Sequence, residues 1–149
     1  TPAVLLSAAR VAVRDQPQRR ALEQAERQLL SIEKAALSIG NRELERRLHG
    51  IVAQGKEILR ILEQRPTDLS RIRRFLVVHL EGTERVAVRY ARSHRFLRGG
   101  ALEQNFRKVL AQIESAFRRQ REQLLKRDLS DLDIQIEVLR RQLESEGIA

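Results

Sequence analysis

The chain has 149 residues, of which 42% are hydrophobic and 33% are charged. This length suits one compact domain, and the composition is too apolar for a disordered tail. Aromatic residues make up only 3%, and seven Gly and three Pro supply little turn chemistry, so a fold of many strands is excluded. The absence of Cys excludes disulfides, thiol catalysis and Cys-ligated metals.

The net charge of +9 is unevenly distributed along the chain. Residues 1–64 carry +3, residues 65–127 carry +10 and residues 128–149 carry −4. Most basic residues are Arg, whose charge is permanent at any working pH. This asymmetry favours an anionic partner, either an acidic protein or an anionic membrane surface. The alternative is that the charges are simply solvated on helix surfaces.

Residues 1–17 form an apolar N-terminal segment, which Arg10 interrupts. No window of about 18 apolar residues occurs, so we expect no segment of the sequence to span a bilayer. The absence of Met, together with the Thr at position 1, predicts a processed or truncated chain.

Two amphipathic helices follow, each with apolar residues alternately three and four positions apart, as in a helix packed against another. The first ends at Gly40-Asn41, and the second ends before Pro66, because a residue preceding proline is pushed out of the α region. Gly55 lies on the second seam, where a missing side chain lets a neighbouring helix approach. The two seams are Leu22, Ala25, Leu29, Ile32, Ala36 and Ile39, and then Leu44, Leu48, Ile51, Gly55, Ile58 and Leu62.

A third helix is predicted to begin with Thr67 or Asp68 as its N-cap, to kink at Gly82 and to reach Tyr90. Gly99-Gly100 is the clearest break in the chain. Beyond it the heptad spacing resumes, at Leu102, Phe106, Val109, Ile113, Phe117 and Leu124.

Ser130 and Asp133 resemble a capping box that starts a last helix, and Gly147 is its expected C-cap. The apolar face of this last helix consists of Leu132, Ile136, Leu139 and Leu143. Because that face must be buried, we expect the acidic helix to dock onto the basic middle of the same chain or of a dimer mate. On this hypothesis, Leu139→Asp destabilises the whole fold.

The predicted architecture is therefore an all-α, antiparallel bundle of four to five amphipathic helices with coiled-coil character. It forms one domain over residues 1–149. An apolar segment (1–17) precedes the bundle helices (18–127), and an acidic helix (128–149) follows them. The sustained heptads also favour a homodimer.

No catalytic constellation is visible in the sequence. His49, His79 and His94 lie on separate stretches, and no HExxH, GxSxG or phosphate-binding glycine motif occurs. His79 lies near an apolar seam and is interpreted as a hydrogen-bonded core residue. A magnesium site at the acids Asp128, Asp131, Asp133 and Glu137 is less consistent with their spacing than helix capping. We therefore predict no catalytic residue, no metal and no cofactor.

Arginines supply the best candidate for a binding surface. Their spacing places each of two groups on a single helix face beside the apolar seam, where the planar guanidinium can pair bidentately with phosphate or carboxylate. Aromatic residues do not interleave with them for base stacking, so we do not expect nucleic acid as the partner. The candidates are Arg71 and Arg74, and then Arg85, Arg89 and Arg92.

Two stretches resemble a known family. The segment Asp131-Leu132-Asp133-Ile134-Gln135-Ile136-Glu137-Val138-Leu139, with Leu143 and Gly147-Ile148 after it, is similar to the closing signature of the 5-bromo-4-chloroindolyl phosphate hydrolysis protein family (XpaC-like). Leu80 and Tyr90, with Arg85 and Arg89 between them, look like the central segment of that family.

The resemblance implies a helical bacterial domain, often preceded by membrane anchors and associated with toxic-anion resistance (TelA-like) proteins. We therefore expect a non-enzymatic interaction or scaffold module at the cytoplasmic face of a bacterial membrane, held there by a segment outside this chain. The family name implies phosphatase activity. The alternative function is accordingly a phosphomonoester hydrolase for indolyl-phosphate-type substrates. It would use His79 or His94 near Arg85 and Arg89, with the acids around Asp131 holding a metal.

Overall fold

The structure is a computed structural model, and it describes residues 16–93 and 100–147. Apart from short turns, these residues are helical and include no strand, which confirms the predicted all-α bundle. The elements are α2 (Gln16–Ile39), α3 (Arg42–Gln64), the 3-10 turn η1 (Pro66–Asp68), α4 (Leu69–Phe75), the π-helical segment η2 (Leu76–Leu80), α5 (Glu81–Ser93) and α6 (Gly100–Ser145). Most of the predicted apolar segment 1–17 and the break at Gly99 lie outside the described residues, as does His94.

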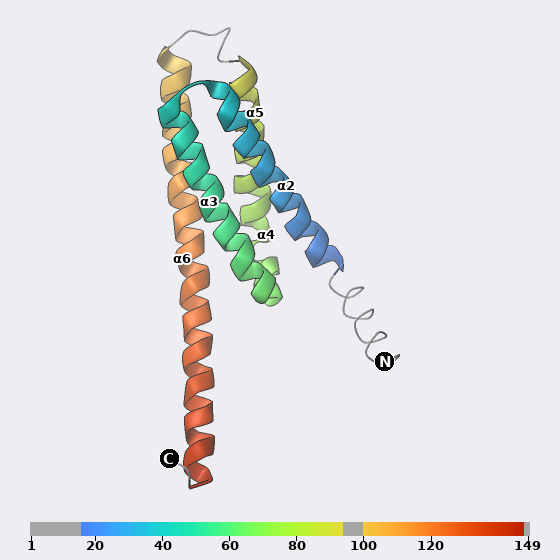
Figure 1. The fold of residues 1–149 in the computed structure, drawn as a ribbon, viewed down its shortest axis with the longest axis vertical. Coiled ribbons are helices and arrows are strands. Elements are labelled where there is room, and N and C mark those ends of the chain that lie inside the picture. The colour runs from blue at the N-terminus through green and yellow to red at the C-terminus, as the bar shows by residue number, and fades with distance from the viewer. Residues whose placement is uncertain (1–15, 94–99, 148–149) are drawn as a thin grey trace.

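With α4, η2 and α5 counted as one rod, successive helices alternate in direction, but the helices that pack together are not all neighbours in sequence (Figure 1). α2 packs against α3 and α5, and α3 packs against α6. The partners in the ion pairs Arg107–Glu43 and Arg121–Glu57 are both 64 positions apart, so α3 and α6 run parallel. The remaining side of the bundle, between α4–α5 and α6, has the loosest backbone contact.

The predicted seams of α2 and α3 form the core. Leu29, Ile32, Leu44 and Leu48 are almost completely buried, as sustained three-and-four spacing requires. Gly55 is buried where a Cβ atom would lie 2.6 Å from Leu29 Cδ2 and 3.4 Å from the Phe117 ring. The close helix approach predicted for this glycine is therefore confirmed.

The turn between α2 and α3 follows the predicted break. Gly40 has a φ of 75°, which glycine adopts without a steric penalty. The Asn41 side chain accepts hydrogen bonds from the backbone N–H groups of Glu43 and Leu44, so it caps the start of α3. Across the same end of the bundle, the Arg107 guanidinium on α6 holds the pKa of the Glu43 carboxyl below its ordinary value through a hydrogen bond.

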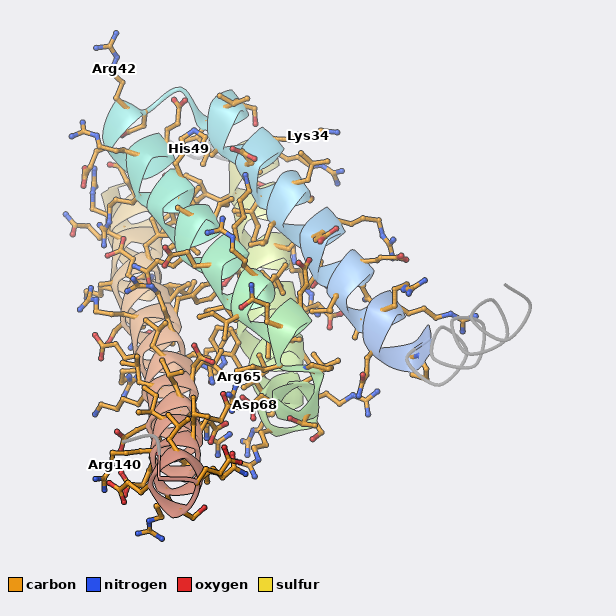
Figure 2. The ribbon with its side chains drawn as sticks, turned by 60° about the horizontal axis from the view of Figure 1, so that its bottom comes forward. Lys34, Arg42, His49, Arg65, Asp68 and Arg140 are labelled. Carbon is orange, nitrogen blue, oxygen red and sulfur yellow. The ribbon has the colours of Figure 1, made fainter. Side chains whose placement is uncertain are left out.

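The turn between α3 and α4 departs from the predicted capping. Asp68 precedes α4 but makes no side-chain capping bond. Its buried carboxylate instead accepts a hydrogen bond from Arg65 Nε at 2.7 Å and pairs with Arg127 of α6 at 3.4 Å. Figure 2 shows Arg65 and Asp68 together at this end of the bundle. The aspartate therefore connects three elements rather than capping one.

α4, η2 and α5 form one continuous rod whose irregularity precedes Gly82. The N–H of Glu81 donates to Leu76 O, five residues back, which widens the turn into a π-helix. The buried Thr83 hydroxyl donates to the His79 carbonyl at 2.5 Å. The predicted kink at Gly82 is thus wrong in position, because the change in helical geometry occurs at Leu76–Leu80.

α6 continues through Ser130 and Asp133 without a break, so the predicted helix start at Ser130 is wrong. Its end projects far beyond the other helices (Figure 1). We call residues 128–145 the C-terminal extension. Leu132, Ile136 and Leu139 are 49%, 56% and 55% exposed, so the predicted docking onto the same chain is also wrong. Gly147 follows the helix with a φ of 74°, as expected of a C-cap glycine.

Candidate anion-binding groove

Hollows lie along the open side of the bundle, between the α4–η2–α5 rod and α6, and we refer to them together as a groove. Two pairs of aromatic rings connect the rod and α6 along this side. Phe75 contacts Phe117 edge to face at 4.9 Å, and Tyr90 stacks on Phe106 at 3.9 Å between ring centroids. Three hollows lie along this seam, and their α6 residues recur every three or four positions, so they belong to one helix face.

The half of the groove beside α4 is cationic. Two hollows of about 410 and 350 Å³ share Arg71, Gln120 and Gln123. Glutamine amides both donate and accept hydrogen bonds, so they complement the arginines around an oxyanion. The basic residues in the two hollows are Arg71, Arg74, Arg119, Lys126 and Arg127.

The half beside α5 is apolar with a cationic rim. Its hollow, of about 420 Å³, has Val86, Leu102 and Val109 in its wall next to the stacked rings of Tyr90 and Phe106. Arg85 and Arg89 line the same hollow. A ligand here would bury apolar atoms and place an anionic group on the guanidinium groups.

Altogether seven basic residues line the groove, and none of the described residues that line it is acidic. We call this surface the cationic groove. Arg85 pairs with Glu81 at 3.5 Å, and Arg127 pairs with Asp68. The other five basic residues make no ion pair with any residue that the structure describes: Arg71, Arg74, Arg89, Arg119 and Lys126. Their uncompensated charge gives the groove a positive potential.

Few groups in the groove could transfer a proton. The His79 ring stacks on Phe75 at 5.1 Å, and its Nδ1 is buried without a hydrogen-bond partner among the described residues. The predicted hydrogen-bonded core histidine is therefore wrong, since the ring lines the cationic groove and Nδ1 is unbonded. Burial raises the pKa of the Tyr90 phenol. No cluster of three or more potential metal ligands occurs within residues 16–93 and 100–147.

The structure divides the predicted arginine set. Arg71 and Arg74 line the cationic half, Arg85 and Arg89 line the apolar half, and Arg92 lines neither. Four of the five candidates thus face one groove. Arg119, Lys126 and Arg127 were missed together with Gln120 and Gln123. The available signal was a stripe on α6 at positions 112, 116, 119, 123 and 126, which has helical spacing and contains no acid.

The other predicted site residues lie away from the groove, on the C-terminal extension. Asp131 pairs with Arg65 at 2.5 Å, and Glu137 pairs with Arg140 at 2.6 Å, which lowers the pKa of the Glu137 carboxyl. Asp133 and Val138 are exposed beside Ile136 and Leu139. Because these acids lie within α6, the capping role predicted for Asp131 and Asp133 is wrong.

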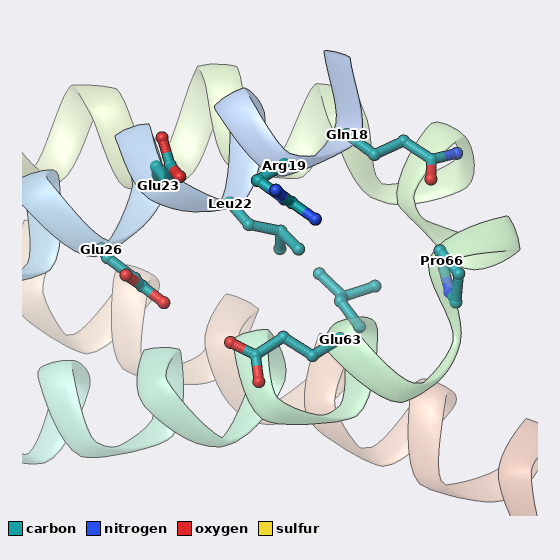
Figure 3. A pocket seen from close by; sticks show the side chains of 8 residues that line it. Gln18, Arg19, Leu22, Glu23, Glu26, Glu63 and Pro66 are labelled. Carbon is teal, nitrogen blue, oxygen red and sulfur yellow. The ribbon is translucent and has the colours of Figure 1, made fainter. Parts of the chain in front are cut away.

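A further hollow, of about 370 Å³, lies between the start of α2 and the end of α3. Figure 3 shows Glu26 on α2 and Glu63 on α3 at this hollow, with Leu22 next to Arg19 on α2. Glu23 also lines it, and Arg19 is its sole basic residue among those described. This acidic lining makes it a poorer site for an anion than the cationic groove.

The fold and the groove define the chain as an all-α bundle protein with an anion-complementary groove along one side. None of the described helices combines the length and the apolar character that crossing a membrane requires. The chain belongs to the 5-bromo-4-chloroindolyl phosphate hydrolysis protein family, whose model matches residues 10–139. No curated protein and no solved structure matches it.

Proposed function

We propose that this chain is a non-enzymatic interaction module that binds an acidic protein partner through the cationic groove. The observation that carries the proposal is the set of seven basic residues around one groove, whose described lining contains no acid. Arginine favours bidentate contacts with carboxylate or phosphate, and glutamines among the arginines add directional hydrogen bonds.

The shape of the site favours a protein partner over a membrane surface. The groove is concave and lies between two helices, whereas a bilayer is met most readily by a flat or convex basic surface with apolar side chains that insert. An acidic amphipathic helix fits the groove better, because its apolar face can lie on Val86 and Val109 while its carboxylates reach the arginines.

Binding to an acidic amphipathic peptide tests the proposal, with vesicles of anionic and of neutral lipid as parallel probes. We expect the peptide to bind, and the affinity to fall as salt rises, because exposed charges are screened. Neutralising Arg71, Arg74 and Arg119 to Gln should weaken binding about tenfold, a loss of roughly 1.4 kcal/mol.

The matched control changes Arg20, Arg27 and Arg42 to Gln. These arginines are exposed on α2 and α3, and their replacement removes the same net charge. Equal losses in the two triple variants would show that net charge, rather than the groove, governs binding. Binding to anionic vesicles but not to the peptide would replace the acidic protein with a lipid surface as the partner.

The second candidate function is phosphomonoester hydrolysis. Two observations favour it: the printed name of the family, and the presence of His79 in the same hollow as Arg71, Arg74 and Arg119. A histidine beside three guanidinium groups could in principle transfer a proton at a bound phosphate.

Incubation of purified protein with nitrophenyl phosphate, with and without Mg²⁺, Mn²⁺ or Zn²⁺, distinguishes the two functions. We expect no turnover from an interaction module. Turnover that His79→Asn abolishes would establish the hydrolase. A site at the cytoplasmic face of a bacterial membrane, and a link to toxic-anion resistance, stay predictions from the family resemblance.

A further inference from the structure

The C-terminal extension is an amphipathic helix whose apolar face is not covered by any residue that the structure describes. Leu129, Leu132, Ile136 and Leu139 are between 49% and 63% exposed. Most of the stability of a helix in a protein comes from packing its apolar face, and this face of the extension is left exposed to solvent. A contiguous exposed apolar stripe of this kind is typical of an interaction surface.

The extension cannot reach the groove of its own chain. α6 is a single helix of 46 residues, and the sequence contains neither Gly nor Pro between positions 101 and 146. A helix needs a break of this kind to turn back on itself. Because none of the residues that the structure describes covers its apolar face, a second molecule is the partner that we consider.

We propose that the C-terminal extension of a second copy occupies the cationic groove, and that two copies exchange their extensions reciprocally about a two-fold axis. This inference rests on the proposed function, because it names a segment of this chain as an acidic partner of the groove. Antiparallel α6 helices would place each extension over the groove of the other copy. Such a contact is isologous and closes as a dimer.

Charge and chemistry are complementary across this contact. The C-terminal extension carries five acidic residues and two arginines, a net charge of −3, and seven basic residues line the groove. The exposed leucines and isoleucine of the extension match the apolar half of the groove, where Val86, Leu102 and Val109 lie. Apolar burial gives affinity, while the charges fix orientation.

The lengths also agree. At a rise of 1.5 Å per residue, the 18 residues of the extension span about 27 Å. The groove follows the α4–η2–α5 rod from Arg71 to Ser93, a distance of about 33 Å by the same measure. The groove is therefore long enough for the whole extension.

Pairing of the two extensions with each other is electrostatically less favourable. Their apolar positions are Leu125, Leu129, Leu132, Ile136, Leu139 and Leu143, which follow a heptad pattern. In an antiparallel coiled coil, all six apolar positions of one helix can pair with those of the other. This pairing brings Lys126 near Arg140 of the second copy, and it brings the two Asp133 residues near each other. A parallel, in-register coiled coil brings Asp128 near Asp133. Both arrangements juxtapose like charges, whereas the groove offers opposite ones.

Sedimentation equilibrium of the full chain over a concentration series tests the dimer. We expect reversible dimerisation that Ile136→Asp weakens at least about tenfold, because it places a charge in the buried face. Val86→Asp in the groove should weaken it similarly. Leu37→Asp is the matched control, since Leu37 is 64% exposed on α2, away from the groove, and it should leave the dimer unchanged.

Cysteine cross-linking identifies the contact, because the chain has no native Cys. Two single-cysteine variants, Ile136→Cys and Val86→Cys, are combined and mildly oxidised. We expect a disulfide between Cys at position 136 of one chain and Cys at position 86 of the other. A strict monomer at high micromolar concentration would overturn the proposal, as would Ile136→Cys chains that cross-link to one another in preference to the Val86→Cys chain.

The two proposals fail separately. A chain that binds the acidic peptide in the groove yet stays monomeric retains the proposed function and loses the exchanged extension. A chain that forms the mixed disulfide, but whose binding to outside acidic partners is indifferent to Arg71, Arg74 and Arg119, uses the groove for self-association alone.

Discussion

Gly55 and Gly50 lie on the same helix but differ in what surrounds them. A Cβ atom on Gly55 would lie 2.6 Å from Leu29 Cδ2 in the core, whereas a Cβ on Gly50 would meet nothing within 4 Å. Helix propensity favours alanine at both positions by about 1 kcal/mol. Steric overlap opposes that gain at Gly55 alone.

We expect Gly55→Ala to lower the free energy of unfolding by about 1 kcal/mol, because overpacking costs roughly 1–3 kcal/mol and exceeds the propensity gain. Gly50→Ala should raise it by about 0.5–1 kcal/mol. Urea denaturation of both variants measures the difference. Equal stabilisation by the two substitutions would mean that Leu29 moves aside without loss and that Gly55 is not needed for close packing.

At the scale of the elements, Asp68 joins η1 to α3 and α6. Its carboxylate is 4% exposed and lies against Arg65 and Arg127, while Arg65 also contacts Asp128 at 3.4 Å and Asp131 on α6. These contacts fasten the end of the bundle at the point where α6 leaves it. The carboxyl hydrogen bonds raise the pKa of the Arg65 guanidinium.

Asp68→Asn should lower the free energy of unfolding by about 1–3 kcal/mol, because it removes the charge that compensates two arginines at a buried position. Asp133→Asn changes the same chemical group on the exposed extension and should alter stability by no more than about 0.5 kcal/mol. Thermal or urea unfolding compares the two. Similar values for both would show that the Asp68 contacts contribute nothing measurable.

For the whole molecule, the C-terminal extension projects from the bundle, so a substitution in the extension can alter self-association without altering the stability of the bundle. Leu139 is 55% exposed and lies outside the core, which contradicts the expectation that Leu139→Asp destabilises the whole fold. We expect this substitution to change the free energy of unfolding by less than about 0.5 kcal/mol at low protein concentration, where the chain is monomeric.

Leu124→Asp is the comparison for Leu139→Asp. Leu124 is on the same helix and also belongs to its three-and-four pattern of apolar residues, but it is only 1% exposed. A charge there would bury an unpaired carboxylate and so destabilise the folded chain. The variant should therefore lose the cooperative unfolding transition that the wild type shows at its midpoint. Should Leu139→Asp destabilise the monomer as strongly as Leu124→Asp, the extension would have to be packed rather than projecting.

The seams of α2 and α3 were predictable because hydrophobic periodicity is a local property of the chain. Leu29, Ile32, Leu44 and Leu48 recur at helical spacing, and all four are buried. The break at Gly40-Asn41 was readable for the same reason, since a glycine with positive φ and a capping asparagine act within a few residues. The π-helical turn at Leu76–Leu80 has no comparable local signature.

Tertiary structure alone decided which faces were covered and which residues met. Leu139 follows the same spacing rule as Leu124, yet one is exposed and the other buried, because periodicity marks an apolar face and does not specify its partner. Likewise, the sequence placed Arg71 and Arg89 on helix faces without indicating what lies opposite them. Because α6 packs in parallel against α3, the side of the bundle between α6 and the α4–η2–α5 rod stays open. Arg71, Arg89 and Arg119 all line the groove on that side. Local patterns determine helices, whereas contacts between distant segments determine the site.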